Sequence, residues 1–317
     1  MKIRRTQNYY VDLYKESKNI FDHKKIYDGR LQFTGLELIE AIVSVGMPDV
    51  YLTKSEKRNR REEINFKIKL FETYVVSTGG PLFFDSMKKQ YLDKTEIGAI
   101  NYWIGMILTT VLGKKKYGYD FMVHLSMIEF FSSRMCIKKR SYFSSTGKIK
   151  FKAPDLLAIS TTKKRYGVFE SKGYSVYNKK AMEKGYQQAK SIKKINGKSP
   201  RNSLVVMTQT GDGEFQIIAK DPEGEGCEIS IDWSFLHLYH YLPVVELIME
   251  LNPQKCGNYI YGTLIWEEEV YLISIFQTIY EKLSLIANKE EQLLFDNLDF
   301  INNLMPYDLD ARVFYVK

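Results

Sequence analysis

The chain has few of the residues that build disulfides or transition-metal sites. Its 317 residues include only three cysteines, Cys136, Cys227 and Cys256, and four histidines. The cysteines are odd in number and lack the spacing of a metal site, so the sequence predicts reduced thiols and a cytoplasmic protein. His237 and His240 are three residues apart, but no cysteine or carboxylate set accompanies them, and core packing is the favoured interpretation.

Long apolar runs are also missing. The most apolar stretch, residues 97–112, is interrupted by glycine, threonine and asparagine, which makes it too short and too polar to span a bilayer. We therefore expect a buried helix at 97–112 and no contact with a membrane. The first residues are basic but lack an apolar segment, so a signal peptide is not expected.

Acidic residues are scarce in the middle of the chain. Residues 134–202 hold 19 lysines and arginines but only three acids, Asp155, Glu170 and Glu183, whereas residues 203–317 hold 19 acids and six basic residues. A segment this positive repels itself unless it faces a polyanion or the acidic part of the chain. Nucleic acid is the commonest such polyanion, although a single run such as 114–116 is better explained as solvated lysine.

The first part of the chain, residues 1–117, is predicted to be mostly helical. Residues 34–46 have Thr34 as a candidate N-cap, apolar residues at helical spacing and Gly46 after the last turn. Residues 54–76 resemble a charged helix with one apolar stripe, and the helix at 97–112 follows.

The pattern then changes to alternating helices and strands in residues 118–220. Residues 119–134 are apolar nearly all round, which predicts a buried helix. Short β-like runs follow at 147–152, 154–160 and 165–172, then a helix at 178–195 and two strands joined by the turn at 211–213.

The last part, residues 221–317, is acidic and has no recognisable motif. It contains a helix at 232–251 that we expect to break near Pro243, a β or helical stretch at 259–285, and a final helix. The sequence thus predicts three regions, with boundaries at 117/118 and 220/221.

Two acids of the basic segment lie at the ends of a predicted β-hairpin. In the strand "YGVFESK" the side chains alternate between faces, so Val168, Glu170 and Lys172 share one face. Asp155 stands near the start of the preceding strand, "PDLLAIS". A hairpin centred on Thr162–Lys163 places Asp155 directly opposite Glu170.

Carboxylates that face each other destabilise a sheet, and a divalent cation between them removes the penalty. Magnesium suits such a site, with manganese as the alternative, because hard cations take carboxylate, carbonyl and water ligands. A bound metal lowers the pKa of its water and polarises a phosphate, and Lys172 can orient that water. The pattern therefore predicts that Asp155 and Glu170 hold a metal ion.

These residues resemble the PD-(D/E)XK phosphodiesterases, the family with the restriction-endonuclease-like fold. The likeness consists of Pro154-Asp155, fourteen intervening residues and then Glu170-Ser171-Lys172, in a predicted α-β-β-β-α-β order over residues 118–220. The resemblance implies an α/β protein whose restriction-endonuclease-like core is a mixed sheet flanked by helices, with a helical N-terminal and a mixed C-terminal addition.

The resemblance also implies roles for single residues. In the family the two acids bind the metal together with the backbone carbonyl between Glu and Lys, which is that of Ser171 here, and the lysine serves the attacking water. A further acid often comes from the helix before the strands, where Glu129 fits. Some members add a Gln or Lys from the helix after the third strand, and Gln188 is the candidate.

Other interpretations stay open for each of these residues. The chain has a second Pro-Asp pair at 48–49 and a second Glu-Ser-Lys triplet at 16–18, in a polar, helix-like context, but only Pro154 to Lys172 has the required order and gap. Asp155 could be a plain turn residue, and Glu170 with Lys172 an exposed strand pair. The other candidates also have structural interpretations. These are surface exposure for Glu129, an ordinary helix position for Gln188, and packing in place of base stacking for Tyr174 and Tyr177.

The sequence therefore predicts a metal-dependent nuclease. The expected enzyme is a magnesium-dependent DNA endonuclease of restriction or phage-defence type, the pathway being an expectation from the family. Its expected partner is nucleic acid, DNA in preference to RNA, and a homo-oligomer or a partner subunit is left open. The alternatives are a nucleic-acid-binding or scaffold protein that keeps the fold without cleavage, and a nuclease that is active only within a larger complex.

Overall fold

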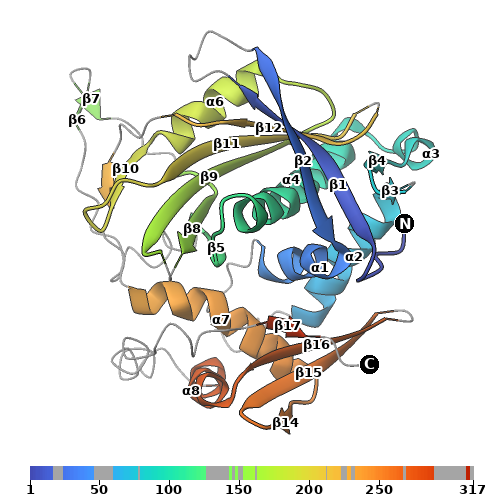
Figure 1. The fold of residues 1–317 in the computed structure, drawn as a ribbon, viewed down its shortest axis with the longest axis vertical. Helices are drawn as coiled ribbons and strands as arrows, with labels where there is room; N and C mark the ends of the chain where they lie inside the picture. Colours follow the sequence, from blue (N-terminus) through green and yellow to red (C-terminus); the bar gives the residue numbers. More distant parts are fainter. Residues whose placement is uncertain are drawn as a thin grey trace. The chain divides into compact units, whose positions relative to one another are not determined.

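The computed structural model describes most of the chain and divides it into two compact units (Figure 1). Unit 1 comprises residues 1–46 and 67–231, and unit 2 comprises residues 47–66 and 232–317. The structure describes residues 1–16, 24–45, 60–77, 79–125, 143–144, 147–148, 153–160, 163–211, 213–222, 227–229, 233–266, 269–288 and 312–314.

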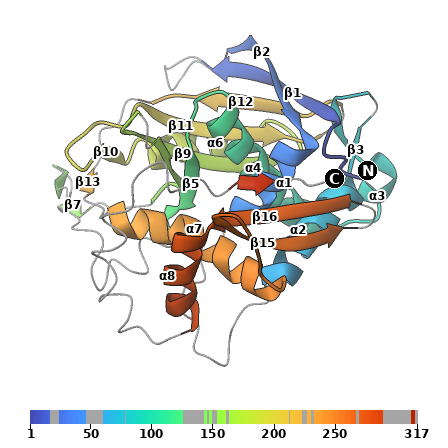
Figure 2. The same ribbon diagram turned by 60° about the horizontal axis from the view of Figure 1, so that its bottom comes forward.

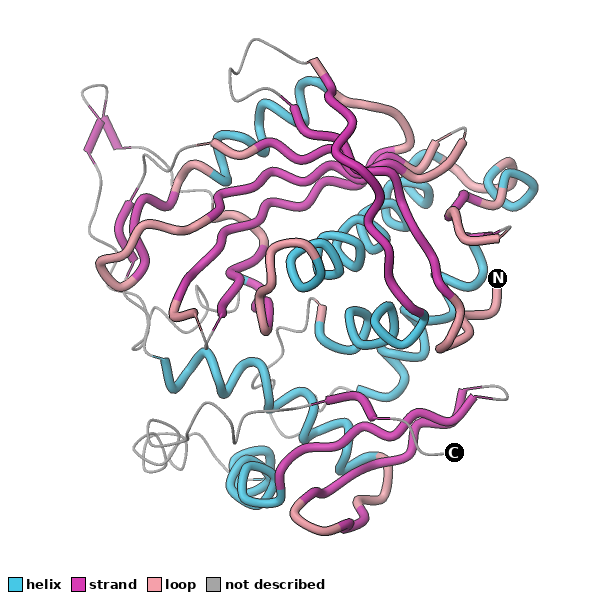
Figure 3. The backbone as a smooth tube through the Cα atoms, in the orientation of Figure 1, coloured by secondary structure: helices cyan, strands magenta, loops and turns pink. Residues whose placement is uncertain are grey.

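Unit 1 is built on a seven-stranded mixed sheet with the strand order β2-β1-β12-β11-β9-β8-β5. The pairs β1/β12 and β9/β11 are parallel, and the other neighbours are antiparallel. Figure 3 shows these strands side by side. The strands are β1 (Asn8–Glu16), β2 (Lys25–Thr34), β5 (Phe121–His124), β8 (Leu156–Ser160), β9 (Arg165–Tyr174), β11 (Asn202–Gln209) and β12 (Gln216–Lys220).

The strands β1 and β2 correct the prediction of a mostly helical N-terminal region. Along β1, Tyr9, Val11 and Leu13 are buried while their neighbours are more exposed, which is the two-residue period of a strand. β1 pairs with β12, whose residues lie about two hundred positions later in the chain. β1 and β2 are therefore part of the central sheet of unit 1.

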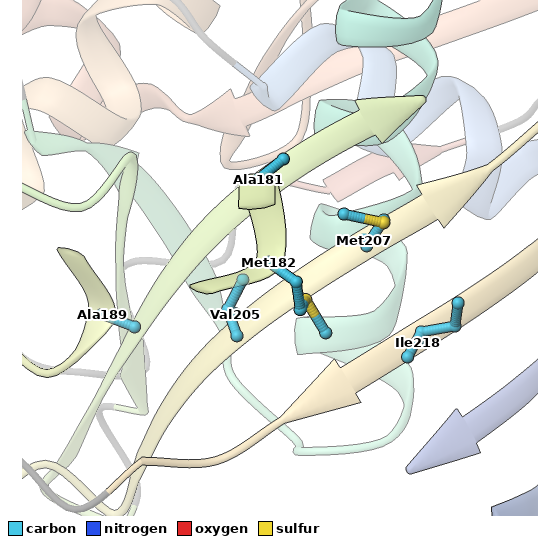
Figure 4. Close-up of a cluster of buried hydrophobic side chains, with 6 residues drawn as sticks. All are labelled: Ala181, Met182, Ala189, Val205, Met207 and Ile218. Carbon is cyan, nitrogen blue, oxygen red and sulfur yellow. The ribbon is translucent and has the colours of Figure 1, made fainter. Parts of the chain in front are cut away.

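Two helices cover opposite faces of the sheet (Figure 1). α4 (Lys94–Lys115) begins at a capping box formed by Asp93 and Glu96 and packs on β9. α6 (Lys179–Ala189) has Asn178 as its N-cap and packs on β9 and β11. Its buried residues Ala181, Met182 and Ala189 join a core cluster with Val205, Met207 and Ile218 of the sheet (Figure 4).

The α4 helix is long and apolar enough to cross a membrane, yet 67% of its most apolar 18-residue stretch is buried inside the protein. The core helix of a soluble protein has the same length and composition. Its contacts with β9 place it in the core of unit 1, as the sequence predicts for residues 97–112.

The remaining elements of unit 1 surround the sheet. α1 (Gly35–Ser44) begins at Thr34, whose hydroxyl accepts a hydrogen bond from the Glu37 N–H at 3.2 Å, so the predicted N-cap is confirmed. α2 (Arg60–Tyr74) runs from unit 2 into unit 1 and leads directly into β3. The short elements are β3 (Val75–Ser77), β4 (Leu82–Phe84), α3 (Ser86–Lys89), β6 (Phe143–Ser144), β7 (Gly147–Lys148), β10 (Ile192–Ile195) and β13 (Cys227–Ile229).

The helix predicted at 119–134 is wrong over its first part, because residues 121–124 form β5, which pairs with β8. An apolar pattern without a clear period fits a buried strand as well as a buried helix. Of the strand predicted at 147–152 the structure describes residues 147–148, which form β7 in a separate two-stranded sheet. Within the described residues the elements follow the order α4, β5, β6, β7, β8, β9, α6, β10 and β11, and of these strands β5, β8, β9 and β11 belong to the seven-stranded sheet.

Unit 2 contains a four-stranded antiparallel sheet with helices (Figure 2). α7 continues past Pro243, so the expected break is wrong. The chain passes between the units at 46/47, 66/67 and 231/232, whereas the sequence-based prediction places its boundaries at 117/118 and 220/221. The elements are α7 (Trp233–Glu250), β14 (Gln254–Cys256), β15 (Tyr259–Trp266), β16 (Glu269–Phe276), α8 (Gln277–Asn288) and β17 (Arg312–Phe314).

Candidate active site

The predicted hairpin is present, with the predicted register. β8 and β9 pair from Ser160 opposite Arg165 to Leu156 opposite Phe169. Asp155 directly precedes β8 and so comes opposite Glu170, the next residue of β9. The Asp155 N–H donates to Glu170 Oε2 at 3.0 Å. Asp155 and Glu170 therefore lie next to each other, as the sequence predicts.

The Asp155 carboxylate is held against the backbone of β9. Its Oδ2 accepts a hydrogen bond from the Ser171 N–H at 2.9 Å. Because the N–H and C=O of a strand residue point to the same side, the Ser171 carbonyl is expected to face the same edge as Asp155. This arrangement brings one backbone oxygen toward the two acids.

Lys172 and Gln188 complete the cluster on the α6 face. The Lys172 ammonium forms an ion pair with Glu170 Oε1 and lies 3.4 Å from Gln188 Oε1. Gln188 Nε2 in turn donates to the Ala153 carbonyl at 3.5 Å. Gln188 therefore bridges the segment before β8 and the lysine of β9, and the structure brings together Asp155, Glu170, Lys172 and Gln188.

Glu170 is fully buried, and its environment disfavours the charged form. Burial and the nearby negative charge of Asp155 raise the pKa of Glu170 to about 7, although Lys172 and the Asp155 N–H act in the opposite direction. This carboxyl group exchanges a proton near neutral pH, which is unusual for a glutamate and typical of functional sites.

A glycine lets α6 approach the acid and the lysine closely. A Cβ on Gly185 would lie 2.6 Å from Val205 Cγ2, 3.3 Å from Lys172 Cε and 3.4 Å from Glu170 Cγ. Any larger residue would push α6 away from the sheet and carry Gln188 with it. Gly185 therefore sets the distance between α6 and the site.

The opposite face of β9 is fixed by α4. Thr109 donates a hydrogen bond to the Ser171 hydroxyl at 3.0 Å. A Cβ on Gly173 would lie 1.8 Å from the Asn101 carbonyl oxygen, and one on Gly105 would lie 3.2 Å from Gly173 Cα. The backbones of α4 and β9 thus touch, and Ser171 and Gly173 face away from the Glu170 side of the strand.

Two residues near the site are absent from the sequence-based prediction. Tyr102 of α4 is 41% exposed, and its pKa is raised by burial of its hydroxyl and by the charges of Asp155 and Glu170. Burial lowers the pKa of His124 on β5, which also senses Asp155 and Lys67. Neither residue belongs to a motif, and His124 falls in the stretch that the apolar pattern assigns to a helix.

The other residues singled out in the sequence either have a structural role or lie outside the residues that the structure describes. Tyr174 and Tyr177 pack against the core cluster under α6, so the packing interpretation is confirmed. Glu16 lies in a strand, not a helix, and forms a buried ion pair with Lys220 at 3.2 Å. Glu129 lies outside the described residues, and for His237 and His240 only the backbone is described.

The donor set fits a hard cation with few protein ligands. Within the described ranges no three His, Cys, Asp or Glu side chains come together, which leaves Asp155, Glu170 and the Ser171 carbonyl as the candidate ligands. Magnesium usually keeps several waters and binds through one or two carboxylates. The residues present therefore match magnesium or manganese better than zinc, which prefers Cys and His.

Comparisons of the chain with protein-family models, with curated proteins and with solved structures found no match.

Proposed function

We propose that the protein is a metal-dependent nuclease that hydrolyses phosphodiester bonds, with DNA as the favoured substrate. The observation that carries the proposal is the pair of hydrogen bonds that hold the two acids together, from the Asp155 N–H to Glu170 and from the Ser171 N–H to Asp155. Two adjacent carboxylates with a lysine beside them match the requirements of metal-assisted phosphodiester cleavage.

In this proposal Asp155, Glu170 and the Ser171 carbonyl hold the magnesium ion. The ion, when bound, supplies a water of lowered pKa and polarises the phosphate. Glu170 must be ionised to serve as a ligand, so ion binding displaces the proton that this residue holds below about pH 7. Lys172, which is positioned by Glu170 and Gln188, orients the attacking water or stabilises the charge that develops on the phosphate.

The order of the elements supports a restriction-endonuclease-like core in this proposal. In that core three antiparallel strands would be β5, β8 and β9, the two helices α4 and α6, and the last strand β11, which runs parallel to β9. In such a core Asp155 would directly precede the second strand, β8, and Glu170 and Lys172 would lie on the third, β9. A cytoplasmic role in restriction or phage defence belongs to the same proposal.

The alternative is a protein that keeps this fold and binds nucleic acid without cleaving it. One observation favours it: protein groups already satisfy the acids, since Glu170 pairs with Lys172 and accepts from the Asp155 N–H while Asp155 accepts from the Ser171 N–H, and the described residues offer no third His, Cys, Asp or Glu side chain. A nuclease that is active only within a larger complex would look the same in the isolated chain.

Supercoiled plasmid and single-stranded DNA incubated with magnesium, manganese or a chelator separate these alternatives. We expect cleavage that needs the metal and that falls by about 10²- to 10⁴-fold in Lys172→Ala, as for loss of a positioned proton-transfer or charge-stabilising group. Lys179→Ala is the matched control, since Lys179 pairs with Glu183 on α6 and takes no part in the site. Binding without cleavage under every metal condition would favour the scaffold.

A further inference from the structure

The rotation of α6 about its own axis is fixed by the residues it buries. The stripe Ala181, Met182, Gly185 and Ala189 faces the sheet, where it packs on β11 and β12 in the core cluster of Figure 4. Because side chains on a helix repeat every 3.6 residues, this stripe determines where every other α6 side chain points. The two flanks of α6 therefore have different neighbours.

One flank leads to the active site. Gln188 lies on it and contacts Lys172 and the segment before β8. Lys184 and Lys180 precede Gln188 by one and two turns on this flank, about 6 and 12 Å along the helix axis. Both lysines are exposed, and neither has a hydrogen bond, ion pair or ring contact with any residue that the structure describes.

On the other flank the lysines have partners. Lys179 Nζ lies 3.9 Å from Glu183 Oε1, and Lys190 Nζ lies 5.9 Å from the centre of the Tyr186 ring. Among contacts between described residues, the lysines of α6 that have no partner are thus those on the flank of Gln188. Lysines placed at random on a solvated helix would not be expected to differ in this way between the two flanks.

We propose that Lys184 and Lys180 bind the backbone phosphates that neighbour the scissile phosphate, so that α6 guides one strand of nucleic acid into the site. The proposal rests on the proposed nuclease function and adds to it the path of the substrate. Two like charges one turn apart repel each other, and a chain of phosphates removes that repulsion. Lysine suits this role because it recognises phosphate as a point charge, without regard to base sequence.

The test measures binding in the non-cleaving Lys172→Ala protein, with and without Lys180→Ala and Lys184→Ala together. Affinity for a duplex and for a single-stranded oligonucleotide is measured over a range of salt concentrations. Each lost phosphate contact lowers the slope of log affinity against log salt by about 0.9 for duplex DNA and about 0.7 for a single strand. We expect the double substitution to lower the slope by about 1.4 to 1.8 and the affinity roughly 15- to 30-fold at 0.15 M salt.

Lys179→Ala on the same helix is the matched control, and alanine preserves helix propensity in every variant. An unchanged slope in the double variant would overturn the inference, and so would an equal fall in the Lys179→Ala control, because the contact would then be general to the helix. The failures of the two proposals are distinguishable. If the double substitution leaves the salt slope unchanged, metal-dependent cleavage by the unmodified protein can still be observed. If the protein does not cleave DNA, the slope of log affinity against log salt can still be measured.

Discussion

At the scale of single residues, Glu170 determines how the site responds to pH. It is fully buried, lies beside Asp155 and has a pKa of about 7, against an ordinary value of 4.5. Between these two pH values the folded protein holds a proton on Glu170 that the unfolded chain has lost. The stability that this proton contributes is complete below about pH 4.5 and is lost as the pH rises through 7.

We therefore expect the metal-free protein to lose about 2 to 4 kcal/mol of its free energy of unfolding between pH 4.5 and pH 7 through this residue. Denaturant unfolding at a series of pH values in chelator measures the loss. Glu170→Gln removes the ionisable group, so its stability should fall less over the same range. Parallel pH curves for the two proteins would show that Glu170 does not hold this proton.

Gln188 gives a second prediction at this scale, because it positions Lys172 without needing to touch the substrate. Among the described residues, removing its side chain leaves Glu170 as the one partner that holds the lysine. Gln188→Ala is expected to lower kcat about 10- to 100-fold with little change in KM, since small misplacements of a catalytic group cost about this much. Gln187→Ala, at the exposed neighbouring position, is the control, and a change confined to KM would argue for a direct contact with the substrate.

At the scale of the elements, the contact between α4 and β9 supports the site from behind. Alanine at Gly173 of β9 would place its Cβ 1.8 Å from the carbonyl oxygen of Asn101 in α4. Alanine at Gly98, also in α4, would meet no atom within 4 Å. We expect Gly173→Ala to destabilise the protein by about 3 kcal/mol or more, and Gly98→Ala to stabilise it by about 0.5 to 1 kcal/mol. Thermal unfolding of both variants tests the pair, and equal stabilities would refute the close contact.

The sequence predicts local elements of this fold better than distant ones. The hairpin of β8 and β9 and the two acids at its ends could be predicted because the turn and the alternation lie within about 20 residues. The strand β5 could not be identified, since its short apolar run fits a helix as well as a strand. In β1 the alternation of buried Tyr9, Val11 and Leu13 is obscured by tyrosines on the other face, and β1 pairs both with the nearby β2 and with β12, about two hundred residues away. Tyr102 reaches the site only through the packing of α4 on β9, which no local pattern encodes.

At the scale of the whole molecule, residues 118–220 cannot form a stable core by themselves. This segment lacks α4, which covers one face of β9, and it lacks β1 and β2, which extend the sheet beyond β12. The buried ion pair between Glu16 and Lys220 would also be broken, leaving a buried lysine without its acid. We expect a 118–220 fragment to show no cooperative thermal transition, and a 1–231 fragment to retain one. Calorimetry on the two fragments distinguishes the outcomes, and a sharp transition in the shorter one would contradict this expectation.

The contact of Gly105 with Gly173 has a consequence for comparisons among relatives. Both positions are limited by backbone atoms, because a Cβ on Gly105 would lie 3.2 Å from Gly173 Cα and one on Gly173 would lie 1.8 Å from the Asn101 carbonyl oxygen. In homologous chains, enlargement at either position should therefore be tolerated only where the helix has shifted away from the strand.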